Sequence, residues 1–137
     1  MKTRSISLAS VIGILLIAVT ACASSNEDPL NGTTWTLASS DGTPPIAGTT
    51  ITMIFEDGNI GGSSGCNSYG GTYQLNDKKI QIGEVTSTLM ACTEPEDVME
   101  QEGIFLSDLN NAQTFQLIGD QLNITTSQGK NLTFNPQ

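Results

Sequence analysis

The chain has 137 residues, enough for one ordinary domain and too few for two. Apolar residues make up 37 % and glycine occurs 14 times, which is too apolar for general disorder and too rich in glycine for a helical bundle. The formal net charge is −9, and beyond residue 4 only three lysines oppose all 14 acidic residues. This balance argues against nucleic-acid binding through phosphate contacts and against adsorption to anionic lipid through a basic patch. Histidine is absent, which removes the Ser-His-Asp and Cys-His nucleophile systems and the commonest zinc ligand.

The first 21 residues have the pattern of a secretion signal. A positively charged start precedes an apolar stretch, residues 6–19, which is short for a membrane span of about 20 residues. The sequence VTAC that follows, at residues 19–22, resembles a bacterial lipobox, in which the cysteine receives diacylglyceryl and becomes the first residue after cleavage. The alternative is an ordinary signal peptide with Cys22 unmodified. We predict a signal peptide over residues 1–21 and an exported protein, lipid-anchored at Cys22 to the extracytoplasmic side of the cell membrane or outer membrane.

The chain contains three cysteines, and lipidation of Cys22 explains the odd number. Cys66 and Cys92 are then the pair available for a disulfide, which an oxidising compartment favours. Such a bond closes a loop of about 27 residues and stabilises by about 3 to 4 kcal/mol on the chain-entropy model. The alternatives are two buried free thiols, or a metal site for which two cysteines without histidine are a poor ligand set. Residues 22–29 are small, polar or acidic and predict a short lipidated tether.

From Leu30 onward the hydrophobic pattern has period two and predicts short strands joined by turns. Asp57-Gly58-Asn59 predicts a tight hairpin turn. The run 61–65 is too rich in glycine for a regular strand, and its glycines are expected to permit a bulge or a close backbone approach rather than to cradle a phosphate. In chain order, the strands are expected around residues 33–37, 50–55, 69–75, 79–82, 85–90, 114–117, 122–124 and 132–134.

The segment from Thr93 to Ala112 has helical period instead. Val98, Phe105 and Leu109 lie on one predicted helix face, and Thr93 precedes Glu96 at the spacing of a capping box. The predicted fold class is therefore mostly β (α+β): a curled antiparallel sheet or small barrel with one packed amphipathic helix.

Acidic residues gather around the predicted helix. A calcium loop is the weaker interpretation, because calcium ligands alternate around a glycine and this run has helical period. No two acids are singled out as a catalytic pair, so we expect no enzymatic activity, no metal and no cofactor. We interpret the group as a solvated helix face that suits the helix dipole: Glu94, Glu96, Asp97, Glu100 and Glu102.

Three stretches are distinctive: LNGTTWTL at residues 30–37, GGSSGCNSYGGTY at residues 61–73 and TLMAC at residues 88–92. Together they resemble the META domain, the HslJ-like (heat shock protein HslJ) family, over about residues 30–134, and we place the domain at residues 30–137. The resemblance implies a compact, mostly antiparallel β-domain with one helix, found in exported bacterial proteins and lipoproteins, linked to stress and without an established catalytic activity. The family motif, for which we expect structural roles, consists of Gly65, Cys66, Asn67, Tyr69, Gly71, Tyr73, Met90 and Cys92.

Two binding hypotheses follow for a non-catalytic module of the cell envelope. The first is an envelope protein as partner, which requires an exposed apolar patch or an unpaired sheet edge. The alternative is a carrier of a small apolar ligand or lipid inside the curled sheet, which requires a cavity of about 300 Å³ or more. For Trp35, Tyr69 and Tyr73 we expect core positions rather than a cavity lining. Asn67 is expected to hydrogen-bond backbone groups, and the membrane is expected as a partner only through the N-terminal lipid.

Overall fold

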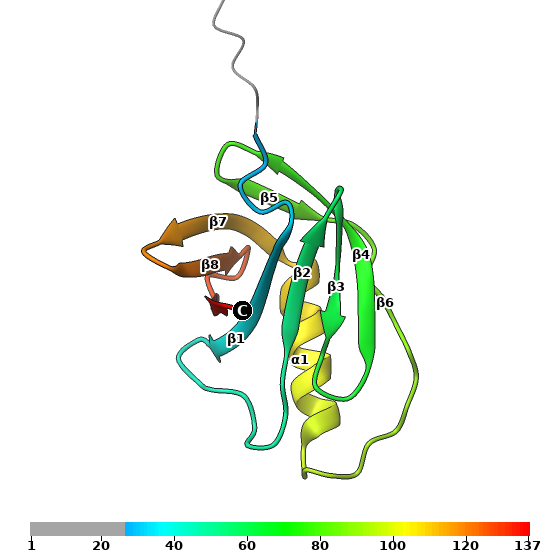
Figure 1. The fold of residues 1–137 in the computed structure, drawn as a ribbon. Helices are drawn as coiled ribbons and strands as arrows, with labels where there is room; N and C mark the ends of the chain where they lie inside the picture. The colour runs from blue at the N-terminus through cyan, green and yellow to red at the C-terminus, as the bar shows by residue number, and fades with distance from the viewer. Residues whose placement is uncertain (1–26) are drawn as a thin grey trace, which may run out of the picture.

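A computed structural model describes residues 27–137, so the predicted signal peptide and Cys22 lie outside the described residues. Eight antiparallel strands close into a barrel in the order β3-β2-β1-β9-β8-β7-β5-β4, with pairing between β3 and β4 completing the ring (Figure 1). The predicted mostly β fold with one helix is confirmed. The strands are β1 (Thr33–Ser40), β2 (Thr52–Glu56), β3 (Asn59–Ser63), β4 (Ser68–Asn76), β5 (Lys79–Ile82), β6 (Thr86–Ser87), β7 (Ala112–Ile118), β8 (Gln121–Thr126) and β9 (Asn131–Pro136).

Tight turns set the register of the barrel. Between β2 and β3, Asp57 (φ 49°) and Gly58 (φ 76°) both adopt left-handed conformations, which form a two-residue hairpin turn. The hairpin predicted at this position is confirmed.

The strand β3 corrects one prediction. It continues through Gly61 and Gly62 as far as Ser63, although the glycine-rich run was predicted to interrupt it. The close backbone approach expected of these glycines is present: a Cβ at Gly62 (φ 154°) would lie 2.2 Å from the carbonyl oxygen of Thr52 on β2. Glycine is therefore required here because the neighbouring backbone occupies the side-chain position.

Large side chains fill the barrel interior. Trp35, Tyr69 and Tyr73 are all buried, as predicted, and the Phe55 and Tyr73 rings make an edge contact with centroids 4.9 Å apart. The packed interior argues against the alternative hypothesis of a ligand inside the sheet. Fully buried members of this core include Leu30, Ile51, Met53, Phe55, Leu109, Leu122, Ile124, Leu132 and Phe134.

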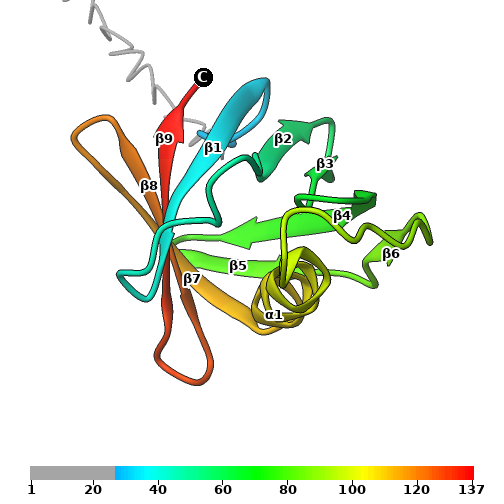
Figure 2. The ribbon, with the colours of Figure 1, turned by 90° about the horizontal axis from the view of Figure 1, so that it is seen from below.

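The helix α1 (Val98–Asn110) lies at one end of the barrel, next to β4 and β5, and is seen end-on in Figure 2. Val98, Phe105 and Leu109 are buried, so the predicted apolar face is confirmed. The predicted capping box is wrong, because the helix begins at Val98, five residues after Thr93. Its N-cap residue is Asp97, which adopts a left-handed conformation and makes no side-chain cap bond. In the part of the chain that the structure describes, no helix is long and apolar enough to cross a membrane.

Candidate functional site

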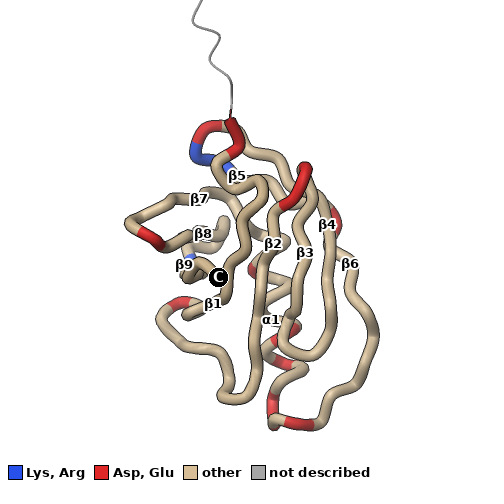
Figure 3. Tube along the Cα trace, viewed as in Figure 1, with Lys and Arg blue, Asp and Glu red and all other residues tan. Residues whose placement is uncertain are grey.

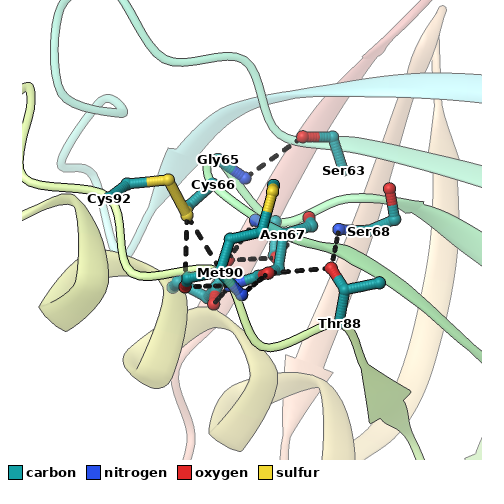
Figure 4. The surroundings of a disulfide bond; sticks show 10 residues. Ser63, Gly65, Cys66, Asn67, Ser68, Thr88, Met90 and Cys92 are labelled. Atoms are coloured by element: carbon teal, nitrogen blue, oxygen red, sulfur yellow. Dashed lines mark hydrogen bonds between the residues drawn. A yellow bond between two sulfur atoms is a disulfide. The ribbon is translucent and has the colours of Figure 1, made fainter.

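A disulfide joins Cys66, in the loop after β3, to Cys92, in the segment between β6 and α1 (Figure 4). The two Cα atoms are 6.0 Å apart, a usual separation for a disulfide. The bond expected from the cysteine count is therefore present in the structure. It fixes the chain shortly before the helix begins.

Asn67 holds the same segment through hydrogen bonds. Its side chain is only 2 % exposed, and its amide pairs with the backbone of Met90 in both directions. Met90 N–H donates to Oδ1 at 2.7 Å, and Nδ2 donates to the Met90 carbonyl oxygen at 3.1 Å. The Thr88 hydroxyl also donates to Oδ1 at 2.8 Å. The Asn67 side chain thus makes the hydrogen bonds to Met90 that a neighbouring strand would otherwise make. The expectation that Asn67 bonds backbone groups is confirmed.

Behind Asn67 lies Glu102 of α1, which is 5 % exposed. Its Oε2 accepts hydrogen bonds from the Ser64 hydroxyl at 2.6 Å and from Asn67 N–H at 2.7 Å. Its Oε1 accepts a third from Asn67 Nδ2 at 2.7 Å. The carboxylate therefore orients the Asn67 amide, leaving Oδ1 free to accept from the loop.

Two opposing effects act on the Glu102 carboxyl. Burial raises its pKa, but the hydrogen bonds from Ser64, Asn67 and the Cys66 backbone outweigh burial and hold the pKa below the usual value of 4.5. The ionised form is therefore favoured in the folded protein. We call Ser64, Asn67, Thr88 and Glu102, together with the disulfide, the clamp.

The clamp corrects the interpretation of the acidic residues. Glu94, Glu96 and Asp97 precede the helix, Glu100 is exposed, and Glu102 is buried rather than part of a solvated face. The helical period contained a signal for this. Position 102 lies four residues after Val98 and three before Phe105, on the same face. A carboxylate on an apolar helix face indicates that it has buried hydrogen-bond partners. Which residues these partners are is seen only in the three-dimensional structure.

The clamped segment, residues 87–91, exposes its side chains and one of its edges. Leu89 is 95 % exposed and Met90 is 56 % exposed. Thr88 N–H donates to the Ser68 carbonyl oxygen at 3.0 Å, so Thr88 and Met90 turn their backbone groups toward β4 and Asn67. Consecutive residues of an extended chain face opposite edges, so Leu89 points its N–H and C=O outward. Within residues 27–137 neither group has a hydrogen-bond partner. The strand predicted over residues 85–90 thus has regular pairing only in β6, and Asn67 continues it.

The other motif residues lie around this centre or in the core. A Cβ at Gly65 (φ 111°) would lie 3.2 Å from Gln101 Nε2, and one at Gly71 would lie 3.2 Å from the Glu84 carbonyl oxygen. The Tyr69 hydroxyl donates to the Thr52 carbonyl oxygen at 2.9 Å. The Tyr73 hydroxyl donates to Asp28, a residue of the predicted tether. Burial raises the pKa of both tyrosines above 10, and for Tyr73 the hydrogen bond to Asp28 adds to the effect.

Across residues 27–137 no three histidine, cysteine or carboxylate side chains are grouped so that they could hold a metal ion. Three motif residues, Cys66, Asn67 and Cys92, thus belong to the clamp, and Met90 is bonded to it. Tyr69 and Tyr73 pack into the barrel. The class of protein that these features define is a small closed β-barrel with one packed helix and a disulfide-linked loop.

The resemblance to the META domain is confirmed by a match to the model of that family. The model of the META domain matches residues 28–137, and the chain belongs to this family. No curated protein is significantly similar in sequence.

Solved structures share the fold. One is an NMR structure of a protein from Burkholderia xenovorans, with 32 % identity, a TM-score of 0.67 and coverage of 79 % of this chain and 83 % of the other. A second NMR structure has 23 % identity and a TM-score of 0.63, covering 77 % and 90 % of the two chains. The crystal structure of a DUF4847 family protein from Bacteroides vulgatus has 19 % identity and a TM-score of 0.59, covering 78 % and 94 %. The last two are similar in fold alone.

Proposed function

We propose that this protein is a lipid-anchored, non-catalytic binding module of the cell envelope that recognises another envelope protein through residues 87–91. The observation that supports the proposal is a loop held by the clamp whose large apolar side chains, Leu89 and Met90, are exposed. The clamp holds the backbone that carries these side chains, and fixing that backbone before binding reduces the entropy lost on association.

The open edge favours a partner segment of extended conformation. Leu89 offers an outward N–H and C=O, and an added strand would pair with both, as in β-strand addition. The charges nearby are acidic: Glu84, Glu94 and Glu96 are all exposed. The lysines of residues 27–137 lie elsewhere, and two of them, Lys78 and Lys79, are at the hairpin between β4 and β5 (Figure 3). A partner segment with apolar residues flanked by lysine or arginine fits this surface best.

The position of the loop supports a protein rather than the membrane as its partner. In Figure 1 the described chain enters beside the hairpin of β4 and β5, whereas the segment from β6 to α1 runs toward the other end of the barrel. The segment from β6 to α1 thus runs away from the point where the described chain begins, and a lipid at Cys22 precedes that point by five residues in sequence. Two or three acyl chains are enough for stable anchoring.

The anchor is tested by Cys22→Ser. We expect the variant to leave the membrane fraction and to appear as a soluble, folded domain, because the acyl chains supply the membrane affinity. Cell fractionation with labelled fatty acid measures this, and near-UV circular dichroism reports on folding. Retention in the membrane, without acyl label, of variant chains from which residues 1–21 have been removed would contradict lipid anchoring.

The partner surface is tested by photo-cross-linking in native membranes. A photoreactive amino acid at position 89 is expected to give one discrete protein adduct. The same group at Gln116, exposed on β7, is the matched control and is expected to give none. The adduct should weaken strongly in an Asn67→Ala background, because the loop then loses both hydrogen bonds to Met90. Identical adduct patterns from positions 89 and 116 would contradict the proposal.

A further inference from the structure

A second recognition feature lies at the end of the barrel, between α1 and the loop that joins β1 to β2. It is a groove of about 480 Å³, within the range of small-molecule sites of roughly 300–1,000 Å³. We call it the mouth groove, and none of its lining residues belongs to the clamped segment. The apolar part of its lining includes the core residues Leu37, Ile51 and Phe105 and, closer to solvent, Pro45, Ile46 and Ile104.

Hydrogen bonds hold the two walls of the mouth groove together. The Gln101 side chain of α1 reaches the opposite loop, where its Oε1 accepts from Ile46 N–H at 2.6 Å. Its Nε2 donates to the Thr49 hydroxyl at 3.1 Å. The Thr49 hydroxyl in turn donates to the Ile46 carbonyl oxygen at 2.7 Å. The groove is therefore formed before any ligand binds, which lowers the cost of binding.

The rim of the mouth groove is negatively charged. Asp41, Asp97 and Glu100 line it and are exposed. The lysine that also lines it, Lys130, is 3.0 Å from Asp108, whose side chain is buried, so its charge is already paired. An apolar floor with unpaired carboxylates at its rim is complementary to a molecule with an apolar body and a positive head.

We propose that the mouth groove binds a small amphiphilic cation: an apolar chain or ring system carrying a protonated amine or a quaternary ammonium group. The apolar part lies against Pro45, Ile46 and Ile104, above the buried side chains of Leu37, Ile51 and Phe105. The cationic head lies among the rim carboxylates. This site is independent of the protein-partner surface, so either proposal can fail without the other.

The test uses the mature chain, residues 22–137, carrying Cys22→Ser, which removes the acyl chains. Its two probes have equal chain length and are used below their micellar concentrations. Decyltrimethylammonium is expected to shift the backbone amide NMR signals of Ile46 and Ile104, with binding at least tenfold tighter than that of decyl sulfate. Equal affinity for the two probes, shifts confined to other parts of the barrel, or no saturable binding would overturn the proposal.

Matched charge-neutralising variants locate the head group. The first combines Asp41→Asn, Asp97→Asn and Glu100→Gln; asparagine suits the left-handed backbone of Asp41 and Asp97, so folding is preserved. We expect a loss of affinity for the cation of at least about tenfold, since three exposed charges are removed and each contributes about two- to fivefold. The control combines Asp77→Asn, Glu84→Gln and Asp120→Asn, removing the same charge outside the groove. An equal loss in both variants would indicate attraction by net charge alone and overturn the site.

Discussion

Replacement of Glu102 by alanine is expected to destabilise the domain by about 3 kcal/mol, although the residue belongs to an acidic run that resembles a solvated surface. In the variant the Ser64 hydroxyl can donate instead to the Asn67 carbonyl oxygen, 2.8 Å away. Asn67 N–H keeps no acceptor, and one hydrogen of its side-chain amide keeps only the weak acceptor Cys66 Sγ, 3.6 Å from Nδ2. Each buried unpaired donor costs about 1–3 kcal/mol. Urea unfolding at pH 7 measures the loss.

Glu100→Gln is the matched control, because Glu100 lies on the same helix but is exposed. We expect a change within about 0.5 kcal/mol, as for most surface substitutions. A similar loss of stability in both variants would contradict the assigned role of Glu102.

The same carboxylate makes stability dependent on pH. The pKa of Glu102 lies below 4.5 in the folded protein, because the hydrogen bonds outweigh burial. As the pH falls below 4.5, the unfolded state therefore binds a proton before the folded state does. The contribution of Glu102 is fully present above pH 4.5 and is lost as the pH falls through the folded pKa. Unfolding free energies measured between pH 7 and pH 3 should decline less in Glu102→Gln than in the native protein.

Loss of the disulfide is the second large effect. Cys66→Ser is expected to lower stability by about 3 to 4 kcal/mol on the chain-entropy model, because the bond links cysteines 26 residues apart. For a domain of this size the melting temperature should fall by about 10 °C or more. Calorimetry of the oxidised protein and of the variant measures the difference.

The reduced native protein is the control for Cys66→Ser, and its melting temperature should match that of the variant. Cys92→Ser should behave in the same way. Equal melting of the oxidised and reduced native proteins would show that the bond does not constrain the chain in solution.

Local sequence patterns predicted the parts of the fold that depend on local interactions. Alternating apolar residues identified most of the strands, and Asp57-Gly58 identified the β2–β3 hairpin. The burial of Val98, Phe105 and Leu109 followed from the helical period, and the pairing of Cys66 with Cys92 from the number of cysteines. Each of these features depends on a short stretch of sequence or, for the disulfide, on the number of cysteines in the chain.

The clamp was not predicted in full because its partners are distant in sequence. Glu102 bonds to Asn67 across 35 positions and to Ser64 across 38, and no local pattern relates these positions. Partners that are distant in sequence also explain why the strand predicted over residues 85–90 is shorter in the structure. Residues 88–90 alternate like a strand, but Asn67 rather than a backbone neighbour pairs with Met90. The start of α1 was misplaced because a bend at residues 94–95 and a turn at residues 96–97 come between Thr93 and the first helical residue, Val98.

The central claim is that the clamp holds residues 87–91 as a fixed loop with one open edge. Amide hydrogen exchange of the native protein, followed residue by residue by NMR, tests it most directly. We expect the amides of Thr88 and Met90 to be protected and that of Leu89 between them to exchange rapidly, because only Leu89 points outward. Protection of Met90 should disappear in Asn67→Ala. Rapid exchange at Thr88, Leu89 and Met90 alike in the native protein would contradict the account.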